Sequence, residues 1–293
     1  MIAIMPSKRT GMYYLEHCRI SQVDEKIVYN QAKEAVTQYF SLPIANTNII
    51  LMGTGTSITQ AAMRIMAENG VMLAVVGGGG TPLYLASQSE YRPNEYFFAY
   101  LKKWQDSVQR LEMAKQLQIQ RIGFVEKQWQ RFEIEIEEVI TAGENFQQKI
   151  KLATDNEQLR SYEANYAKKL YAVQVKHFNI ENFTRTPCKK DETDIFNSYL
   201  DHARYLAYGL AAVTLWVLGI PHSMAVSHGA TRRGALVFDV ADVIKDGIVM
   251  PVAMSYAKND EPRNKMRKRC IAEFNNSKTL DVLFNCMKQL IGT

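Results

Sequence analysis

The chain has 293 residues, of which 47% are hydrophobic and 22% charged, and its formal net charge is +5. This composition excludes a disordered or fibrous protein, and the length predicts one large domain or, as we expect, two modest ones. The amino terminus has no apolar run long enough for a signal peptide, which predicts a cytoplasmic protein. The four cysteines lie far apart, so we expect reduced thiols and neither disulfides nor a structural zinc site.

Residues 1 to about 90 alternate short β-favouring runs with turn residues. We expect strands over residues 13–20, 26–30, 48–53, 71–77 and 82–87. One helix is expected from Ser57 to Asn69, opened by a Ser57–Gln60 capping pair and closed before Gly70. The pattern predicts a small, mostly β domain with one helix.

From about Pro93 the sequence changes to long, charged, glutamine-rich helices. Arg92-Pro93 marks the predicted boundary between an amino-terminal domain, 1–90, and an all-helical domain, 93–293. The uncharged run 205–220 stops at Pro221, short of the roughly 20 apolar residues that a membrane span needs. The run 205–220 therefore predicts a buried central helix and no membrane contact. Residues 179–193 predict a loop.

Two glycine-rich turns raise the question of nucleotide binding. Residues 53–60, GTGTSITQ, lack both the Lys-Ser/Thr end of a P-loop and the third glycine of the dinucleotide fingerprint. Residues 77–80, GGGG, lead into another expected strand, where a tight turn is the simpler explanation. We expect no nucleotide cofactor here, and a nucleotide-dependent metabolic enzyme is the weakest of three functional hypotheses.

Three aspartates interrupt an apolar helical stretch near residue 240. Asp239, Asp242 and Asp246 have spacings that place them on one helix face, opposite a row of valines. Acids near a helix start can also simply face water. His228 precedes a glycine break, residues 229–234, that would fold it back toward the aspartates, and one imidazole with two carboxylates is typical of an Mn²⁺ or Mg²⁺ site.

The ligand set of such a site stays open on residue patterns alone. A lone histidine is more often structural than a metal ligand, and the other histidines compete with His228: His17, His177, His202 and His222. A further ligand must come from elsewhere in the chain. The eligible glutamates include Glu157, Glu163 and Glu181.

Basic residues concentrate toward the carboxyl end. The segment from Lys258 to Arg269 holds six basic residues against two acids. Such clusters suit DNA phosphates, although a solvated helix face explains this segment equally well when it is taken alone. Arg232 and Arg233, inside the glycine break, are candidates for holding a phosphate beside the aspartates.

Taken together, five long motifs resemble the Cas1 family of CRISPR-associated integrases and, within it, the type I-F branch. They follow one another over nearly the whole chain: IANTNIILMGTGTSITQAAMR, GVMLAVVGGGGTPLY, SEYRPNEY, LDHARYLAYGLAAVTLWVLGIPHSMAVSHG and TRRGALVFDVADVIKD. The resemblance implies an α+β protein with a small amino-terminal β domain, a larger all-helical catalytic domain and a homodimeric assembly.

The resemblance also implies a reaction and a site. The family's metal-binding glutamate matches Glu163, its histidine matches His228, and its downstream acids match Asp239 and Asp242. Members cut or join DNA phosphodiesters with a divalent ion, Mg²⁺ or Mn²⁺, and insert short DNA segments into a CRISPR array through attack by a 3′-hydroxyl. Asp239 is expected either as a ligand or as a residue that orients one, and the implied partner is a fused Cas2/3 nuclease-helicase.

The amino-terminal domain is expected to serve dimerisation and partner contacts. A surface of basic residues is expected to hold double-stranded and branched DNA: Arg232, Arg233, Lys245, Arg263, Arg267, Lys268 and Arg269. The alternative to an integrase is a non-catalytic DNA-binding scaffold that keeps the fold and the basic surface without the chemistry.

Overall fold

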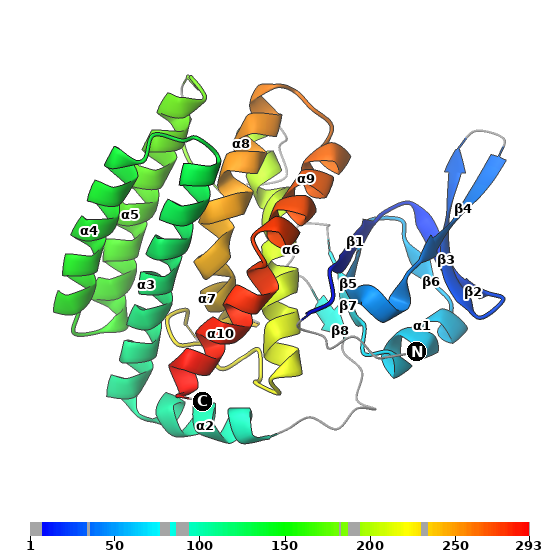
Figure 1. Cartoon of the computed structure of the whole chain (residues 1–293), viewed down its shortest axis with the longest axis horizontal. Helices are drawn as coiled ribbons and strands as arrows, with labels where there is room; N and C mark the ends of the chain where they lie inside the picture. Colours follow the sequence, from blue (N-terminus) through cyan, green and yellow to red (C-terminus); the bar gives the residue numbers. More distant parts are fainter. Residues whose placement is uncertain are drawn as a thin grey trace.

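A β-rich amino-terminal region lies beside a larger helical region (Figure 1). The computed structural model describes residues 8–33, 36–76, 83–85, 94–181, 183–186, 194–229 and 234–292. The arrangement confirms the predicted α+β class. The expected boundary at Arg92-Pro93 lies outside the described residues, so the division into domains 1–90 and 93–293 stays a prediction.

Two four-stranded sheets build the described part of the amino-terminal region. The first has three parallel strands and one antiparallel edge strand, in the order β1 (Gly11–Leu15), β5 (Thr47–Met52), β7 (Met72–Val75) and β8 (Leu83–Leu85). The second has the order β4 (Val36–Leu42), β3 (Lys26–Lys33), β2 (Cys18–Val23) and β6 (Ser57–Ile58). Every residue of β5 is buried, as expected for a strand that is covered on both faces.

The expected strand over residues 13–20 is wrong in one respect, because it breaks in the middle. His17 adopts a left-handed backbone conformation with φ of 50°, and the two halves become β1 and β2 in different sheets. The expected helix at Ser57 begins later, at Gln60, because the Thr59 side chain accepts the capping bond from the Ala62 amide. Strand β4 was not predicted, and residues 77–80 lie outside the described part of the chain.

The helical region confirms the long helices that the sequence predicts after Pro93. Its helices are α2 (Glu95–Gln105), α3 (Ser107–Arg131), α4 (Glu137–Leu152), α5 (Asn156–His177), α6 (Ile195–Val217), α7 (Ala235–Ile244), α8 (Met250–Lys258), α9 (Arg263–Asn276) and α10 (Thr279–Ile291). One turn of π-helix, η3 (Lys245–Val249), joins α7 to α8 without a break. In Figure 1, α3, α4 and α5 stand together on the side of α7 and α8 that faces away from the sheets.

Helix α6 is the predicted central buried helix. It carries the uncharged run from Tyr205, and it packs against β5 as well as against α7 and α8. Gly209 permits this approach, since a Cβ atom there would lie 3.3 Å from the Ile49 side chain. In the described part of the chain, no helix has both the length and the apolar character to cross a membrane.

Helix α7 and the π-helix lie inside the helical region. Every residue of α7 is buried, and so are Asp246 and Gly247 of η3. A Cβ atom at Gly247 would lie 2.6 Å from the Phe124 ring of α3, so a glycine is needed at this crossing. The aspartates therefore do not face open water, which excludes the simpler interpretation of their spacing.

One arginine of the basic segment joins the two regions. Arg267 of α9 donates to Glu16 Oε1 at 2.8 Å, and its guanidinium lies 4.2 Å from the centre of the Tyr14 ring. It also lies 2.7 Å from His202 Nε2. Burial, then Arg267 and Arg263, lower the pKa of His202 to about 4, so this histidine is neutral near pH 7 and accepts the bond.

Arg267→Gln is expected to lower the free energy of unfolding by about 2 kcal/mol, because it removes charge-assisted bonds from a buried contact. The matched control is Lys268→Gln, which changes the adjacent exposed residue and should cost less than about 0.5 kcal/mol. Urea unfolding of both variants measures the difference. Equal losses would show that Arg267 does not fasten the two regions together.

Candidate metal and DNA-processing site

Charged side chains gather where α3, α5, α7 and η3 meet. Glu163 comes from α5, Asp239 and Asp242 from α7, and Arg121 from α3. The π-helix adds Lys245 and Asp246. The structure therefore brings residues from distant parts of the sequence into one buried, charged cluster, and His228 lies at its edge on the loop before α7.

Asp239 organises the loop that carries His228. Its side chain is 1% exposed. Its two carboxylate oxygens accept the backbone amides of Val226 (2.8 Å), Ser227 (3.2 Å) and His228 (3.1 Å). The same carboxylate lies 2.7 Å from His228 Nδ1. Both oxygens are thus occupied, which favours an orienting role for Asp239 over that of a direct ligand.

Other side chains hold the carbonyl side of the same loop. Four successive carbonyls, from Met224 to Ser227, accept hydrogen bonds from Tyr100, Trp104, Asn156 and Arg160. These side chains come from α2 and α5. A loop bound on both its amide and carbonyl sides holds His228 in a defined position before any ligand arrives.

His228 has one ring nitrogen committed and one available. Its Nδ1 contacts Asp239, whereas its Nε2 makes no hydrogen bond with the described residues. Burial lowers the pKa of His228. The bond to Asp239 and the negative charges of Asp242, Asp239 and Glu163 raise the pKa by more than burial lowers it, so the net pKa is above the ordinary value for histidine. A carboxylate on one imidazole nitrogen is the usual arrangement when the other nitrogen binds a metal.

Glu163 is held by a buried arginine. Arg121 is 2% exposed, and its Nη1 donates to Glu163 Oε1 at 2.7 Å and to Gln118 at 3.0 Å. Its Nε donates to Asp246 Oδ2 at 2.8 Å, and Nη2 donates to the same oxygen. Burial lowers the pKa of Arg121, but Asp246 and Glu163 outweigh it and raise the pKa well above its usual value.

Asp242 is paired with Lys245, one helical turn further on. Burial raises the pKa of Asp242, but Lys245, Arg121 and His228 together lower it, so the carboxyl group is ionised near neutral pH. Its Oδ1 accepts from Lys245. Its Oδ2 accepts no hydrogen bond from the described residues, and the same is true of Glu163 Oε2.

The chemistry of the cluster fits a divalent cation. Four carboxylates (Glu163, Asp239, Asp242, Asp246) face two cations (Arg121, Lys245), which leaves a net charge of −2 when His228 is neutral. Two carboxylate oxygens and one imidazole nitrogen suit Mn²⁺ or Mg²⁺. As the side chains stand, no three His, Cys, Asp or Glu residues in the described part of the chain form a ready metal cluster. Glu163 and Asp242 are bound by their basic partners instead.

The competing histidines and glutamates lie elsewhere. His202 binds Arg267, and His17 lies in the turn between β1 and β2. Glu157 is exposed in the first turn of α5, and Glu181 is exposed beyond the end of that helix at His177. Residue patterns did not distinguish these candidates from His228 and Glu163, whereas their positions in the fold do.

The residues expected to bind DNA are divided between surface and interior. Arg232 and Arg233 lie outside the described residues. Lys245 faces Asp242, and Arg267 faces the amino-terminal region. Arg263 donates to Ser198 and lies over the Tyr199 ring. Lys268 is exposed, and Arg269 is exposed while pairing with Glu273.

Residue patterns missed Arg121, which holds two of the acids. A signal was present, because Arg121 lies with Gln118 and Gln128 on the face of α3 that buries Leu117 and Val125. A charged residue at a core-facing position of an amphipathic helix indicates a buried partner. The sequence alone does not say which acid that partner is.

The protein thus combines a β-rich region with a larger helical region, and the helical region contains a buried site of acids and one histidine. The sequence profile of the family described as CRISPR associated protein Cas1 matches residues 13–272. The chain belongs to the Cas1 family. It is 40% identical to the CRISPR-associated endonuclease Cas1 of Pectobacterium atrosepticum, over 98% of this chain and 94% of that protein, and 38% identical to its counterpart from Pseudomonas aeruginosa, with the same coverage.

Solved structures share the fold at lower identity. A crystal structure of a TtCas1-DNA complex superposes with a TM-score of 0.74 at 22% identity, covering 96% of this chain and 91% of that one. A casposase bound to an integration product superposes with a TM-score of 0.72 at 14% identity, covering 96% and 90%. These similarities establish the fold. The assignment of residues to the site depends on the geometry of this chain alone.

Proposed function

We propose that this Cas1-family protein is a divalent-metal-dependent DNA endonuclease and integrase of the type I-F branch, which inserts spacer DNA into a CRISPR array. The observation that carries the proposal is the His228–Asp239 pair, which fixes the imidazole and leaves Nε2 without a partner among the described residues. Asp242 and Glu163 lie near enough for their charges to raise the pKa of His228. The named activity of the Pectobacterium and Pseudomonas relatives supports it. We place this activity in the cytoplasm, where the protein can reach the CRISPR array.

In this proposal Glu163, His228 and Asp242 hold Mg²⁺ or Mn²⁺, and Asp239 orients His228. When bound, the ion stabilises charge on the attacking or departing oxygen of a phosphodiester. The protein's own groups prepare the site. Lys245 keeps Asp242 ionised, and Arg121 holds one oxygen of Glu163. Loading requires the three ligands to come closer together than they lie here.

The DNA must be held largely by its backbone, because an integrase accepts many spacer sequences. Lys268 and Arg269 of α9 are exposed and available for phosphates. We assign DNA contacts also to Arg232 and Arg233. A homodimer, with the amino-terminal region contributing to dimerisation and to a Cas2/3 partner, completes the proposal, and the solved Cas6-RT-Cas1–Cas2 complex supports an assembly of this general kind.

The second candidate is a DNA-binding scaffold without catalysis. One observation favours it: Glu163 and Asp242 each form an ion pair, and the described residues contain no ready metal cluster. A scaffold predicts that these ion pairs persist in solution. An integrase predicts that a divalent ion competes with them.

Branched DNA and Mn²⁺ separate the two candidates. The wild type should cut or join strands, and Asp242→Ala should lower that rate at least about 100-fold, since it removes an ion ligand. Asp260→Asn is the matched control, because it removes one negative charge at an exposed position with a left-handed backbone that asparagine tolerates. Cleavage that is equal in wild type and Asp242→Ala would remove Asp242 from the site. A wild type without activity would favour the scaffold.

A further inference from the structure

Two basic side chains occupy carboxylates of the proposed ion site. Arg121 donates to Glu163, and Lys245 donates to Asp242. As these pairs stand, no three ligating side chains among the described residues form a ready metal cluster. An ion therefore binds only if at least one of the two basic groups gives up its carboxylate. The surroundings of Arg121 and Lys245 differ, and they identify the group that yields.

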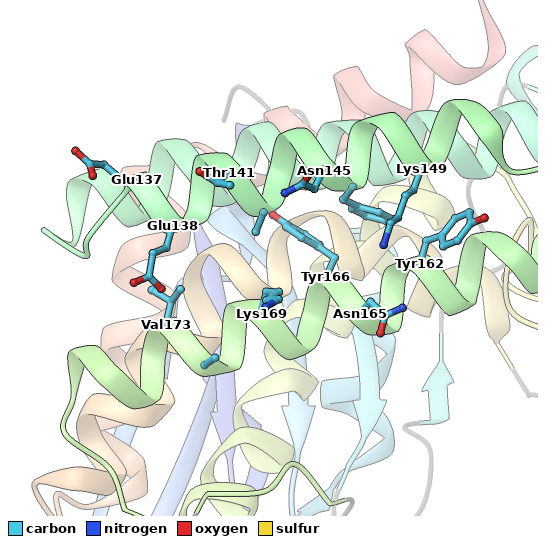
Figure 2. Close-up of a pocket in the computed structure, with 13 residues that line it drawn as sticks. Glu137, Glu138, Thr141, Asn145, Lys149, Tyr162, Asn165, Tyr166, Lys169 and Val173 are labelled. Carbon is cyan, nitrogen blue, oxygen red and sulfur yellow. The ribbon is translucent and has the colours of Figure 1, made fainter.

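Arg121 is fixed in place. It is 2% exposed, and besides Glu163 it donates to Gln118 and to Asp246. Its guanidinium lies 5.7 Å from the centre of the Tyr166 ring. Figure 2 shows Tyr166 reaching from α5 toward α4, where it lines a groove of about 600 Å³ that Arg121 does not reach. Arg121 is thus separated from this open space, and moving it would break several bonds at once.

Lys245 is held less firmly. Its side chain is 25% exposed, and Asp242 is the only described residue to which its ammonium donates. Burial lowers the pKa of Lys245, but the charges of Asp242 and Asp246 raise it by more, so the group remains an ammonium ion. A lysine carries a point charge on a flexible stem. It can therefore leave one carboxylate without breaking any other bond of its ammonium group.

A cavity of about 100 Å³ beside Lys245 gives the ammonium room to move. Asp246 also lines this cavity, and it follows Lys245 directly in the π-helix η3. Asp246 Oδ2 accepts from Arg121, whereas its Oδ1 accepts no hydrogen bond from the described residues. Two arginines of the lining, Arg185 and Arg204, share Asp201 as their counter-ion. Their remaining charge favours the Asp246 side of the cavity for a displaced lysine.

We propose that Lys245 is an internal counter-ion, which neutralises Asp242 in the metal-free protein and moves to the cavity beside Asp246 when a divalent ion binds. Asp242 is almost fully buried, and an unpaired buried carboxylate is strongly destabilising. Lys245 thus protects the fold while the site is empty, and it lowers the affinity for the ion because it competes with it. The inference rests on the proposed function for Asp242 as a ligand, but its test measures ion binding and not catalysis.

The test titrates the full-length protein with Mn²⁺ and follows the free ion by electron paramagnetic resonance. Lys245→Gln should bind Mn²⁺ about 10-fold more tightly than the wild type, because the competing cation is gone and the cluster is more negative. Mn²⁺ should also raise the melting temperature of Lys245→Gln by more than that of the wild type. A residue that merely supports the ligands would give the opposite sign.

Two controls separate competition at Asp242 from a general effect of charge. Arg204→Gln removes the same charge from the wall of the same cavity, and Arg204 makes no ion pair with Asp242, so the affinity should change less than about 3-fold. In an Asp242→Ala background, Lys245→Gln should likewise change the affinity less than about 3-fold, because no carboxylate remains for the lysine to occupy.

A variant that keeps the charge tests the inference in the other direction. Lys245→Arg should weaken Mn²⁺ binding about 3-fold or more, since an arginine can hold the carboxylate with two bonds. This variant also serves if Lys245→Gln does not fold without metal, which melting temperatures in EDTA reveal. Tighter binding by Lys245→Arg would contradict the inference.

Unchanged or weaker Mn²⁺ binding by folded Lys245→Gln would overturn the inference, and so would an equal gain in Arg204→Gln. Cleavage of branched DNA is scored separately. The expected affinity changes with an inactive wild type remove the proposed function alone, whereas an active wild type with unchanged affinities removes the role of Lys245 alone. A protein that binds no Mn²⁺ in any variant removes both.

Discussion

Arg121→Leu is expected to lower the free energy of unfolding by about 3–5 kcal/mol, since it leaves a buried carboxylate without its counter-charge. Asp246 is almost fully buried, and it receives two bonds from Arg121 through Nε and Nη2. Glu163 loses its partner too, but 18% of its side chain is exposed, so water can take over part of that role. Urea unfolding at pH 7 measures the loss.

The double variant Arg121→Leu/Asp246→Asn provides the control. Removing the carboxylate charge together with its partner should recover at least about half of the loss, because the penalty comes from the unpaired charge and not from the missing contact. A double variant that is less stable than Arg121→Leu would show that Asp246 is stabilised by something other than Arg121. Losses below about 1 kcal/mol for Arg121→Leu would mean that water already reaches the pair.

Asp239→Ala is expected to damage both folding and activity. It deprives the Val226, Ser227 and His228 amides of their acceptor, and we expect a loss of about 3 kcal/mol in unfolding free energy. It also frees the imidazole, and loss of such an orienting carboxylate lowers metal affinity or activity by about 10–100-fold. Thermal unfolding and Mn²⁺-dependent cleavage measure the two effects.

His228→Ala separates these roles. The imidazole is 24% exposed, so its removal should cost less than about 1 kcal/mol, while cleavage should fall at least as far as in Asp239→Ala. The two variants thus differ in stability and agree in lost activity. A large drop in melting temperature for His228→Ala without metal would identify a structural histidine and remove it from the ligand set.

Much of the fold could be predicted because it follows from local patterns. The uncharged run from Tyr205 predicts a buried helix, and α6 is one. The change of texture after Pro93 predicts the helical region, and the strands around Ile49 and Leu73 lie where apolar runs predict them. Local patterns failed at His17, where a single left-handed residue sends one apparent strand into two sheets, because its conformation depends on the packing of both.

The candidate site was predictable only in part. The spacing of Asp239 and Asp242 placed them on one face of α7, and family resemblance pointed to Glu163 and His228. Spacing did not show that the aspartates are buried, since that depends on α3 and α6 covering α7. Nor did it show that Arg267, inside a basic run, turns inward to Glu16.

The sequence by itself determined the order and type of most elements, the family, and which side chains are chemically able to hold a cation. The tertiary structure alone decided which of them meet: Arg121 with Glu163 and Asp246, Asp239 with the His228 loop, and Lys245 with Asp242. Periodicity specifies the face of a helix on which a charge lies. The partner that neutralises this charge in a buried position is set by packing between segments that are distant in the chain.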